Sequence, residues 1–318
     1  MTRARVGFLG PEGSFSHEAV VTLEGVEAVA FASIAEVLSA VADGTLDTGL
    51  VPLENAIEGT VSATIDGLVF DHDLVIEREI VLPIRMHLLA RPGVTPAQVT
   101  RVSSYVHALA QVRGYLSANL GHAQIEQTTS TSQAAREVAE SEEPWAAVGS
   151  SIAASLFGLE IIASDIADHQ ENATRFVEVG RGEIPAPTGH DRTSIVCFQD
   201  ADRPGSLYGI LGRFAARDIN LTKLESRPTK RGLGDYCFVI EFDGHVGDDV
   251  IGDCLADLQA HLVRVKFLGS YPVTGEASRV RRTEVGAARR AAAQWIEALR
   301  SRIRRTRDAV ALPDSPHS

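Results

Sequence analysis

The chain has 318 residues, enough for two domains, and its 44% hydrophobic and 23% charged residues are ordinary for a soluble globular protein. No run approaches the ~20 apolar residues of a membrane helix, and the net charge of -12 argues against nucleic acid as the main partner. Cys197, Cys237 and Cys254 are too few and too scattered for a disulfide framework or a zinc site, so no metal is predicted.

The first element is predicted to be a buried strand over residues 3–10. No signal-peptide hydrophobic region precedes it, so a cytoplasmic protein is expected. A glycine-rich loop over 10–16 then leads to a helix beginning near His17. Ser14 or Ser16 can cap this helix, and free N–H groups at its start suit a carboxylate. A capped turn and a ligand site both remain open for this loop.

An alternation of strand 26–31, helix 33–43 and strand 47–53 predicts a mainly parallel α/β sheet. The third strand ends at Glu54 and Asn55. Ligands of open α/β sheets sit outside the carboxyl ends of strands, so both are candidate site residues. The structural alternative is that Asn55 turns the chain and Glu58 caps a helix.

Two apolar strands between 74 and 91 predict a crossing into a second lobe. Lobe one is expected at about 1–76 and 158–182, and lobe two at about 77–157. Lobe two carries Ser104 after a strand and Gln111 on a helix over 107–120. Two α/β lobes joined by crossing strands form a cleft of the kind that binds small ligands.

The stretch from Asn172 to Phe176 enters a strand with a hydroxyl, a guanidinium and an aromatic ring in succession. Because strand side chains alternate, Thr174 and Phe176 share one face and Arg175 takes the other. A threonine in a cleft can donate a proton to a leaving group, and an arginine can pair with a carboxylate or brace the loop. The alternative is a strand start with a surface arginine.

A linker over 182–191 precedes a second pattern of strands and helices. Its order is strand 193–199, helix 204–216, strand 219–227, strand 235–242, helix 247–260 and strand 262–271. This βαββαβ order predicts a ferredoxin-like domain over 191–273. The tail over 276–318 holds 10 Arg against 5 acidic residues and predicts a basic amphipathic helix over 279–307. A partner surface or the protein's own acidic body is favoured over nucleic acid as its contact.

Several motifs together resemble those of prephenate dehydratases. Phe157, Leu159, Ile162 and Asp168 precede Thr174 at the positions that mark that family, and GPEGSFS, VPLENAIEGT and NATRF occur in its order. The segment with LTKLESRP resembles the ACT domain that follows in the family. The chain is therefore similar to a monofunctional prephenate dehydratase with a C-terminal ACT regulatory domain.

This resemblance implies a two-lobed, periplasmic-binding-protein-like catalytic domain over 1–182. The implied reaction is the decarboxylative dehydration of prephenate to phenylpyruvate in phenylalanine biosynthesis, without a cofactor. Thr174 corresponds to the family's essential threonine. The full set of implied catalytic residues is Thr174, Asn55, Ser104, Gln111 and Arg175. Implied substrate-binding residues are Ser14, Glu54, Thr60, Thr129 and Phe176.

The ACT resemblance implies feedback by phenylalanine, bound between paired ACT domains of a homodimer or homotetramer. The implied effector residues are Gly205, Ser206, Leu207, Asn220, Leu221, Glu225 and Ser226. The chain departs from the family twice: Tyr105, Val106 and His107 replace His-Pro-Gln after Ser104, and Ser206 replaces alanine. Two alternatives stay open, an arogenate dehydratase and a sensor of aromatic acids without catalysis.

Overall fold

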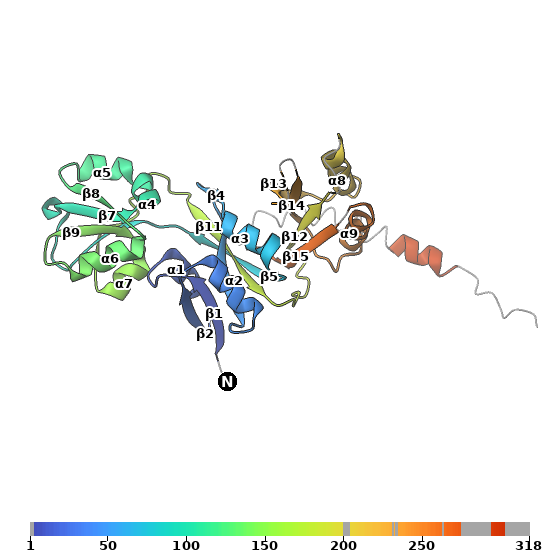
Figure 1. Cartoon of the computed structure of the whole chain (residues 1–318), viewed down its shortest axis with the longest axis horizontal. Coiled ribbons are helices and arrows are strands. Elements are labelled where there is room, and N and C mark those ends of the chain that lie inside the picture. The colour runs from blue at the N-terminus through green and yellow to red at the C-terminus, as the bar shows by residue number, and fades with distance from the viewer. Residues whose placement is uncertain are drawn as a thin grey trace, which may run out of the picture. The chain divides into compact units, whose positions relative to one another are not determined.

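A computed structural model describes residues 3–199, 204–230, 232, 235–262, 264–274 and 294–302 (Figure 1). The chain divides into one compact unit of Met1–Thr274 and a second of Gly275–Ser318. The described residues of the first unit form three β-sheets. In the described ranges, no helix combines the length and the apolar character needed to cross a membrane.

Lobe one is built on a six-stranded sheet in the order β2-β1-β3-β11-β5, with β4 paired to β3. Its strands are β1 (Ala4–Leu9), β2 (Val26–Phe31), β3 (Thr48–Asn55), β4 (Gly59–Thr60), β5 (Val75–Pro83) and β11 (Ala173–Gly180). Its helices are α1 (Phe15–Val20), α2 (Ile34–Ala42), α3 (Ser62–Asp66) and the π-helical turn η1 (Gly67–Asp71). The first three strands are parallel, and β11 runs antiparallel between β3 and β5.

Lobe two has a five-stranded sheet in the order β10-β6-β9-β7-β8. Its strands are β6 (His87–Ala90), β7 (Arg101–Tyr105), β8 (Gln124–Thr128), β9 (Trp145–Gly149) and β10 (Glu160–Ala163). Its helices are η2 (Pro96–Gln98), α4 (Val106–Gln111), α5 (Arg113–Asn119), α6 (Thr131–Glu140) and α7 (Ser151–Phe157). The predicted α/β fold with two lobes is confirmed.

Both crossings between the lobes lie later in the chain than the sequence predicts. The strand β5 stays in the lobe-one sheet as far as Pro83, and β10 pairs with β6 of lobe two. The predicted boundaries at 76 and 157 are therefore wrong, because a long half-buried strand and a short edge strand extend the two sheets. The predicted helix over 107–120 also breaks, at Val112. There Asp168 from the returning segment accepts hydrogen bonds from the first backbone N–H groups of α5.

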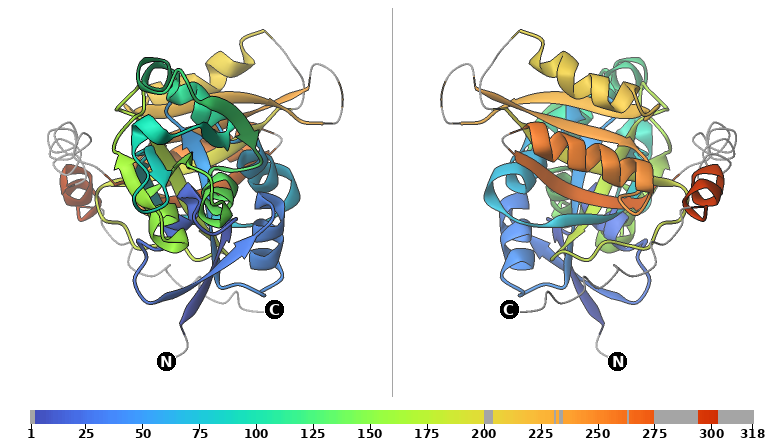
Figure 2. Two further views of the ribbon diagram at one scale, coloured as in Figure 1. Left: turned by 90° about the vertical axis from the view of Figure 1, so that its left-hand side faces the viewer. Right: turned by 90° about the vertical axis from the view of Figure 1, so that its right-hand side faces the viewer.

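The third sheet is antiparallel, in the order β13-β14-β12-β15. Its elements are β12 (Asp191–Phe198), α8 (Ser206–Ala215), β13 (Leu221–Pro228), β14 (Tyr236–Asp243), α9 (Asp249–His261) and β15 (Arg264–Pro272). Figure 2 shows both helices over one face of this sheet. Apolar side chains of α8 and α9 pack there with Ile195 and Ile240. The predicted ferredoxin-like arrangement is confirmed.

The other face of the third sheet packs directly on lobe one. Val239 and Leu268 share one apolar core with Leu38 and Val179. Gly269 makes this approach possible, because a side chain there would meet the backbone of Ile76 on β5. A linker pattern had indicated separate domains, whereas the structure joins them through a common core.

The three cysteines lie in this C-terminal sheet and its helices, buried and free. Burial raises the pKa of the Cys197 thiol to about 12. Of the predicted helix over 279–307, residues 294–300 are helical and 301–302 form a turn, and the remaining positions lie outside the described residues.

We expect Gly269→Ala to lower the free energy of unfolding by about 2–4 kcal/mol, since its φ of +143° is strained for alanine and its new methyl group meets the β5 backbone. The matched control is Gly252→Ala in α9, where the added carbon has only an ordinary contact at 3.7 Å and should be neutral or slightly stabilising. Thermal unfolding measures both. Equal melting temperatures for the two variants would contradict the close approach of β15 to β5.

Candidate functional site

Thr174 lies at the start of β11, where this strand pairs with Asn55 at the end of β3. Its side chain is buried, with the residue 8% exposed. The Asn55 Nδ2 group donates a hydrogen bond of 2.9 Å to Thr174 Oγ1. The two residues that the sequence analysis placed first at the site are therefore direct partners.

The orientation of the Asn55 amide is fixed by the turn that follows β3. Its Oδ1 accepts hydrogen bonds from the backbone N–H groups of Ile57 at 2.9 Å and Glu58 at 3.0 Å. The amide nitrogen must therefore face Thr174, whose oxygen acts as the acceptor. The hydroxyl proton of Thr174 has no acceptor among the described residues, so it is left to be donated. Asn55 both turns the chain and belongs to the site.

A chain of side-chain hydrogen bonds extends from this pair into lobe two. Asn55 Nδ2 donates to Asn172 Oδ1 at 3.0 Å, and Asn172 Nδ2 donates to Gln111 Oε1 at 2.8 Å. Gln111 Nε2 then donates to Glu58 Oε1 at 3.3 Å. We call Thr174, Asn55, Asn172, Gln111 and Glu58 the amide chain. It brings three predicted catalytic residues together and adds two that the sequence analysis did not assign.

The two lobes also touch through the glycine-rich loop of lobe one. Ser150 Oγ donates to the Gly13 carbonyl at 2.9 Å, and Ser132 Oγ donates to the Glu12 carbonyl. Gly13 has a φ of +82°, and a side chain there would lie 2.8 Å from Ser132 Oγ. The loop therefore docks on α6 and α7 of lobe two because this residue is glycine.

His17 holds the same loop from within lobe one. Its Nδ1 accepts the Gly13 N–H at 3.0 Å while its ring stacks on Phe8. Burial lowers the pKa of His17 below the usual histidine value, which favours the neutral ring that can accept this bond. Ser14 caps α1 through a 3.2 Å bond from the His17 N–H and donates to the Leu9 carbonyl. The capping interpretation of this loop is therefore confirmed, and the Ser14 hydroxyl is engaged locally.

Three further predicted site residues lie away from the amide chain. Ser104 is 0% exposed and donates to the Val148 carbonyl at 2.6 Å, so its hydroxyl joins β7 to β9. Phe176 is 1% exposed and packs with Phe8 in the core of lobe one, so its ring offers no surface to a ligand. Thr129 is exposed in the loop after β8, at the carboxyl end of the lobe-two sheet.

Arg175 points away from the amide chain and toward the C-terminal sheet. Its guanidinium reaches Glu241 at 2.8 Å, Glu54 at 2.9 Å and Glu79 at 3.4 Å. The arginine therefore pairs with three carboxylates of the protein itself, and a role toward the substrate stays a prediction.

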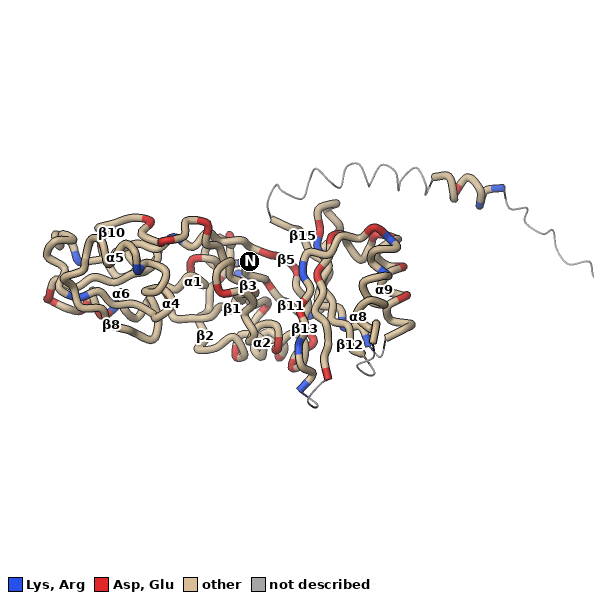
Figure 3. Tube along the Cα trace, turned by 90° about the horizontal axis from the view of Figure 1, so that it is seen from above, with Lys and Arg blue, Asp and Glu red and all other residues tan. Residues whose placement is uncertain are grey.

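Arg175 belongs to a group of ion pairs that joins lobe one to the C-terminal sheet. Arg192 Nη1 contacts Glu79 at 2.7 Å, and Lys223 Nζ contacts Glu54 at 3.3 Å. We call the six residues the ion-pair network: Glu54, Glu79, Arg175, Arg192, Lys223 and Glu241. Figure 3 shows acidic and basic positions together in the region of β5, β11 and β13. Glu79 and Glu241 were not assigned in the sequence analysis. The signal that could have identified these partners of Arg175 is a glutamate within a largely apolar strand.

The electrostatics of the network favour its charged forms. Burial works against the charge of Arg175, but Glu241 and its other neighbours raise the pKa above the usual arginine value. Burial likewise opposes the charge of Glu54, yet Lys223 and Arg175 hold its pKa below the usual range. Glu54 and Thr60 were predicted to bind substrate. In this structure both contact β13, because Glu54 lies 3.3 Å from Lys223 Nζ and Thr60 Oγ1 donates to Glu225 Oε2 at 2.7 Å.

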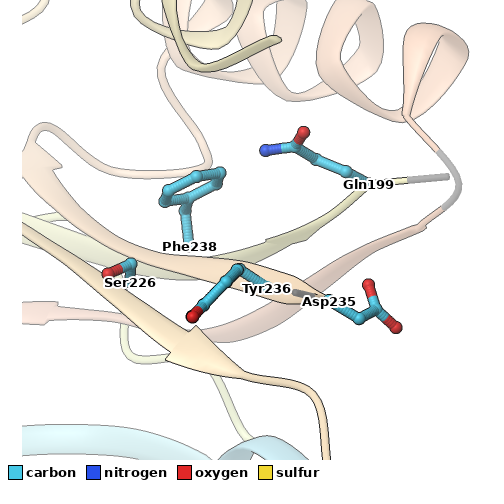
Figure 4. Close-up of a pocket in the computed structure, with 5 residues that line it drawn as sticks. All are labelled: Gln199, Ser226, Asp235, Tyr236 and Phe238. Atoms are coloured by element: carbon cyan, nitrogen blue, oxygen red, sulfur yellow. The ribbon is translucent and has the colours of Figure 1, made fainter. Parts of the chain in front are cut away.

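Four of the seven predicted effector residues line two neighbouring cavities in the C-terminal domain. Gly205, Ser206 and Leu207 line a hollow of about 610 Å³ at the start of α8. Ser226 lines an adjoining cavity of about 190 Å³ with Gln199, Asp235, Tyr236 and Phe238 (Figure 4).

The other three predicted effector residues point elsewhere. The side chain of Asn220 bonds to Asp243 at 3.0 Å, and Leu221 packs in the core between the C-terminal sheet and its helices. Glu225 faces Thr60 of lobe one. The contacts of these three side chains do not indicate an effector role, because each side chain already contacts another part of the protein.

Comparison with known proteins gives two family matches. Residues 6–184 match the family model described as prephenate dehydratase, and residues 193–259 match the ACT domain. A prephenate dehydratase of Mycolicibacterium vanbaalenii is 38% identical over 315 residues, which covers 93% of this chain and 98% of the relative.

Solved structures extend the similarity to the fold. The prephenate dehydratase of Arthrobacter aurescens in complex with L-Phe has a TM-score of 0.81 and 35% identity, covering 93% of this chain and 99% of that one. A quorum-quenching acylase, GqqA, has a TM-score of 0.78 and 29% identity, covering 85% of this chain and 98% of that one.

The two lobes and the C-terminal sheet thus define an α/β enzyme with a regulatory ACT domain. The chain belongs to the prephenate dehydratase family, an enzyme family of carbon–oxygen lyases.

We expect Lys223→Met and Glu54→Gln to lower the melting temperature at pH 7, because each breaks a contact of 3.3 Å in the ion-pair network. The folded-state pKa of Glu54 lies below its unfolded value. This charge therefore stabilises the fold fully above about pH 5, and the stabilisation is lost as the pH falls through the folded-state pKa. Both deficits relative to wild type should shrink toward pH 3.5 in thermal unfolding. Deficits that stay constant with pH would contradict a stabilising charge on Glu54.

Proposed function

We propose that the chain converts prephenate to phenylpyruvate, and that Thr174 donates the proton to the departing hydroxyl group. The observation that carries this role is the direction of the 2.9 Å bond between Asn55 and Thr174. Because Thr174 Oγ1 accepts from Asn55, its own O–H remains available as a donor. Family membership supports the reaction, and the bond direction supports the role of the residue.

In the proposed reaction, the bond between the ring and its carboxylate breaks and carbon dioxide leaves. The electron pair of that bond enters the ring, which becomes aromatic as the C4–O bond breaks. The departing hydroxide takes the proton of Thr174 and leaves as water, and the threonine oxygen regains a proton from solvent. Aromaticity supplies much of the driving force, so the chain needs to place a donor and orient the substrate. Such acid assistance is typically worth about 100- to 10,000-fold in rate.

The amide chain supports an acid better than a nucleophile at this position. An acylase such as the one named for the GqqA structure would need a base to take the proton of its nucleophile. The group that contacts Thr174 Oγ1 is an amide N–H, which donates a proton and accepts none. Arogenate differs from prephenate by an amino group in place of a keto group, far from the departing hydroxyl. Arogenate dehydratase therefore remains the nearer alternative.

We expect Thr174→Ala to lower kcat by about 100- to 10,000-fold with prephenate, because it removes the donor. Thr174→Ser keeps a hydroxyl beside Asn55 and should retain a measurable part of the activity. Formation of phenylpyruvate measures both. Wild-type kcat in Thr174→Ala would contradict the acid role, and equal losses in both variants would show that packing by the methyl group matters instead.

We also propose that phenylalanine binds at the hollow beside α8 and inhibits the enzyme. Support comes from the lining by Gly205, Ser206 and Leu207 and from the L-Phe complex of the Arthrobacter relative. A homodimer or homotetramer is proposed as well. The edge strand β13 exposes Leu224, and Tyr208 and Tyr236 are exposed nearby, which suits pairing with a second copy. A cytoplasmic location stays a prediction.

The contacts of β13 with lobe one could transmit the effect of bound phenylalanine to Asn55 and Thr174. Lys223 and Glu225 reach Glu54 and Thr60 of lobe one, while Ser226 on the same strand lines the cavity that adjoins the hollow beside α8. Glu54 directly precedes Asn55 of the amide chain. A shift of β13 on binding phenylalanine would therefore act next to the Asn55–Thr174 pair.

We expect Glu225→Ala to weaken inhibition by phenylalanine while the affinity for phenylalanine changes little, because the contact to Thr60 is lost. Coupling free energies of about 1–3 kcal/mol correspond to 5- to 150-fold effects, so the loss is measurable. Calorimetry gives the affinity, and turnover at saturating phenylalanine gives the inhibition. The control is Asp253→Ala on the exposed side of α9. Inhibition of Glu225→Ala equal to wild type would contradict coupling through this contact.

A further inference from the structure

Asn172 is a buried polar residue to which the sequence analysis gave no role. It is 3% exposed and lies directly before β11, where the chain returns from lobe two. Its carbonyl accepts the Ile84 N–H at 2.8 Å, and Ile84 directly follows β5 at the outward crossing. The backbone of Asn172 is thus fixed at the junction of the two lobes.

The side chain of Asn172 uses both of its ends within the amide chain. Its oxygen accepts from Asn55 of lobe one, and its nitrogen donates to Gln111 of lobe two. The direction of every bond follows from the Ile57 and Glu58 N–H groups that hold Asn55 Oδ1. The chain ends at the Glu58 carboxylate, which can only accept when ionised. Donors and acceptors therefore match along its whole length.

We propose that Asn172 is a positioning residue that orients the Asn55 amide toward Thr174. Asn172 Oδ1 and Thr174 Oγ1 both accept from Asn55 Nδ2, at 3.0 and 2.9 Å. A fixed acceptor at Asn172 therefore aims the amide nitrogen at the threonine oxygen. The proposal rests on the proposed role of Thr174 as the acid.

This arrangement also ties the orientation of the acid to contact between the lobes. Gln111 lies on α4 of lobe two, whereas Asn55 and Thr174 lie in the lobe-one sheet. Asn172 links Gln111 to the amide nitrogen of Asn55, whereas Glu58 links Gln111 to the amide oxygen of Asn55. If the lobes were to separate, Asn172 would lose Gln111 Oε1 as the acceptor for its nitrogen and would be held less firmly.

The first test is a double-mutant cycle on kcat with prephenate. Asn172→Ala should lower kcat by about 10- to 100-fold, because small misplacements of reacting groups have effects of that size. In an Asn55→Ala background the same change should have little further effect, since Asn172 acts through Asn55. Asn119→Ala on α5 is the control, because its amide donates to the Tyr115 carbonyl outside the amide chain.

Two results of this cycle would overturn the proposal. One is a kcat of Asn172→Ala equal to that of Asn119→Ala. The other is a loss of equal size in the wild-type and Asn55→Ala backgrounds, which would indicate a general defect in packing. Failure of the acid role itself is recognised separately, because Thr174→Ala would then retain wild-type turnover whatever the cycle shows.

The second test uses Asn172→Asp, which has nearly the same shape and guards against a folding defect in the alanine variant. An ionised aspartate can accept from Asn55 but cannot donate to Gln111, whereas a protonated one can do both. The ratio of its kcat to that of wild type should therefore rise as the pH falls from 8 to 5. Glu58 and His107, which are 3.2 Å apart beside the amide chain, are present in both proteins, so the ratio removes any effect that both proteins share. A ratio that does not change with pH would overturn the proposed use of both ends of this side chain.

Discussion

The alternation of side chains along β11 is the constraint on which the rest of the structure depends. Thr174 meets Asn55 at the junction of the lobes, Arg175 reaches the C-terminal sheet, and Phe176 packs into the core of lobe one. Because these three residues are consecutive in one strand, their side chains cannot change position independently of one another. A change in the contacts of Arg175 therefore acts on the residue next to Thr174, the proposed acid.

In the ACT domain, the side chains of β13 also alternate between two different environments. Lys223 and Glu225 face lobe one, and Ser226 lines the cavity that adjoins the hollow beside α8. The strand β13 pairs with β14, whose Cys237 and Val239 belong to the apolar core that both domains share, so a shift of β13 would act on a closely packed interface with lobe one. The proposed regulation thus needs no long pathway, because effector side and catalytic side are opposite faces of one strand.

Local patterns in the sequence predicted most of the fold. The alternation of strands and helices gave both lobes and the βαββαβ order, and the polar residues at the end of β3 indicated Asn55. Lobe boundaries were missed because strand ends depend on pairing partners distant in sequence. The resemblance to a known family supplied Thr174 and Gln111, which the structure then joins through Asn172.

The roles of Arg175, Glu54 and Thr60 could not be predicted, because their partners lie on β13 and β14, which the sequence presents as part of another domain. Ser104 shows the reverse case. The family resemblance implied a catalytic role for it, whereas tertiary packing buries its hydroxyl against a backbone carbonyl. Pairings that span 61 residues, as between Asn172 and Gln111, leave no local signal in the sequence.

The central claim is tested most directly by supplying purified protein with prephenate and arogenate separately near neutral pH, without added metal. Phenylpyruvate and phenylalanine are quantified as the two products. We expect rapid formation of phenylpyruvate from prephenate. A preference for arogenate would keep the elimination chemistry and contradict the proposed substrate. No turnover of either, with tight binding of an aromatic acid, would contradict catalysis and favour a sensor.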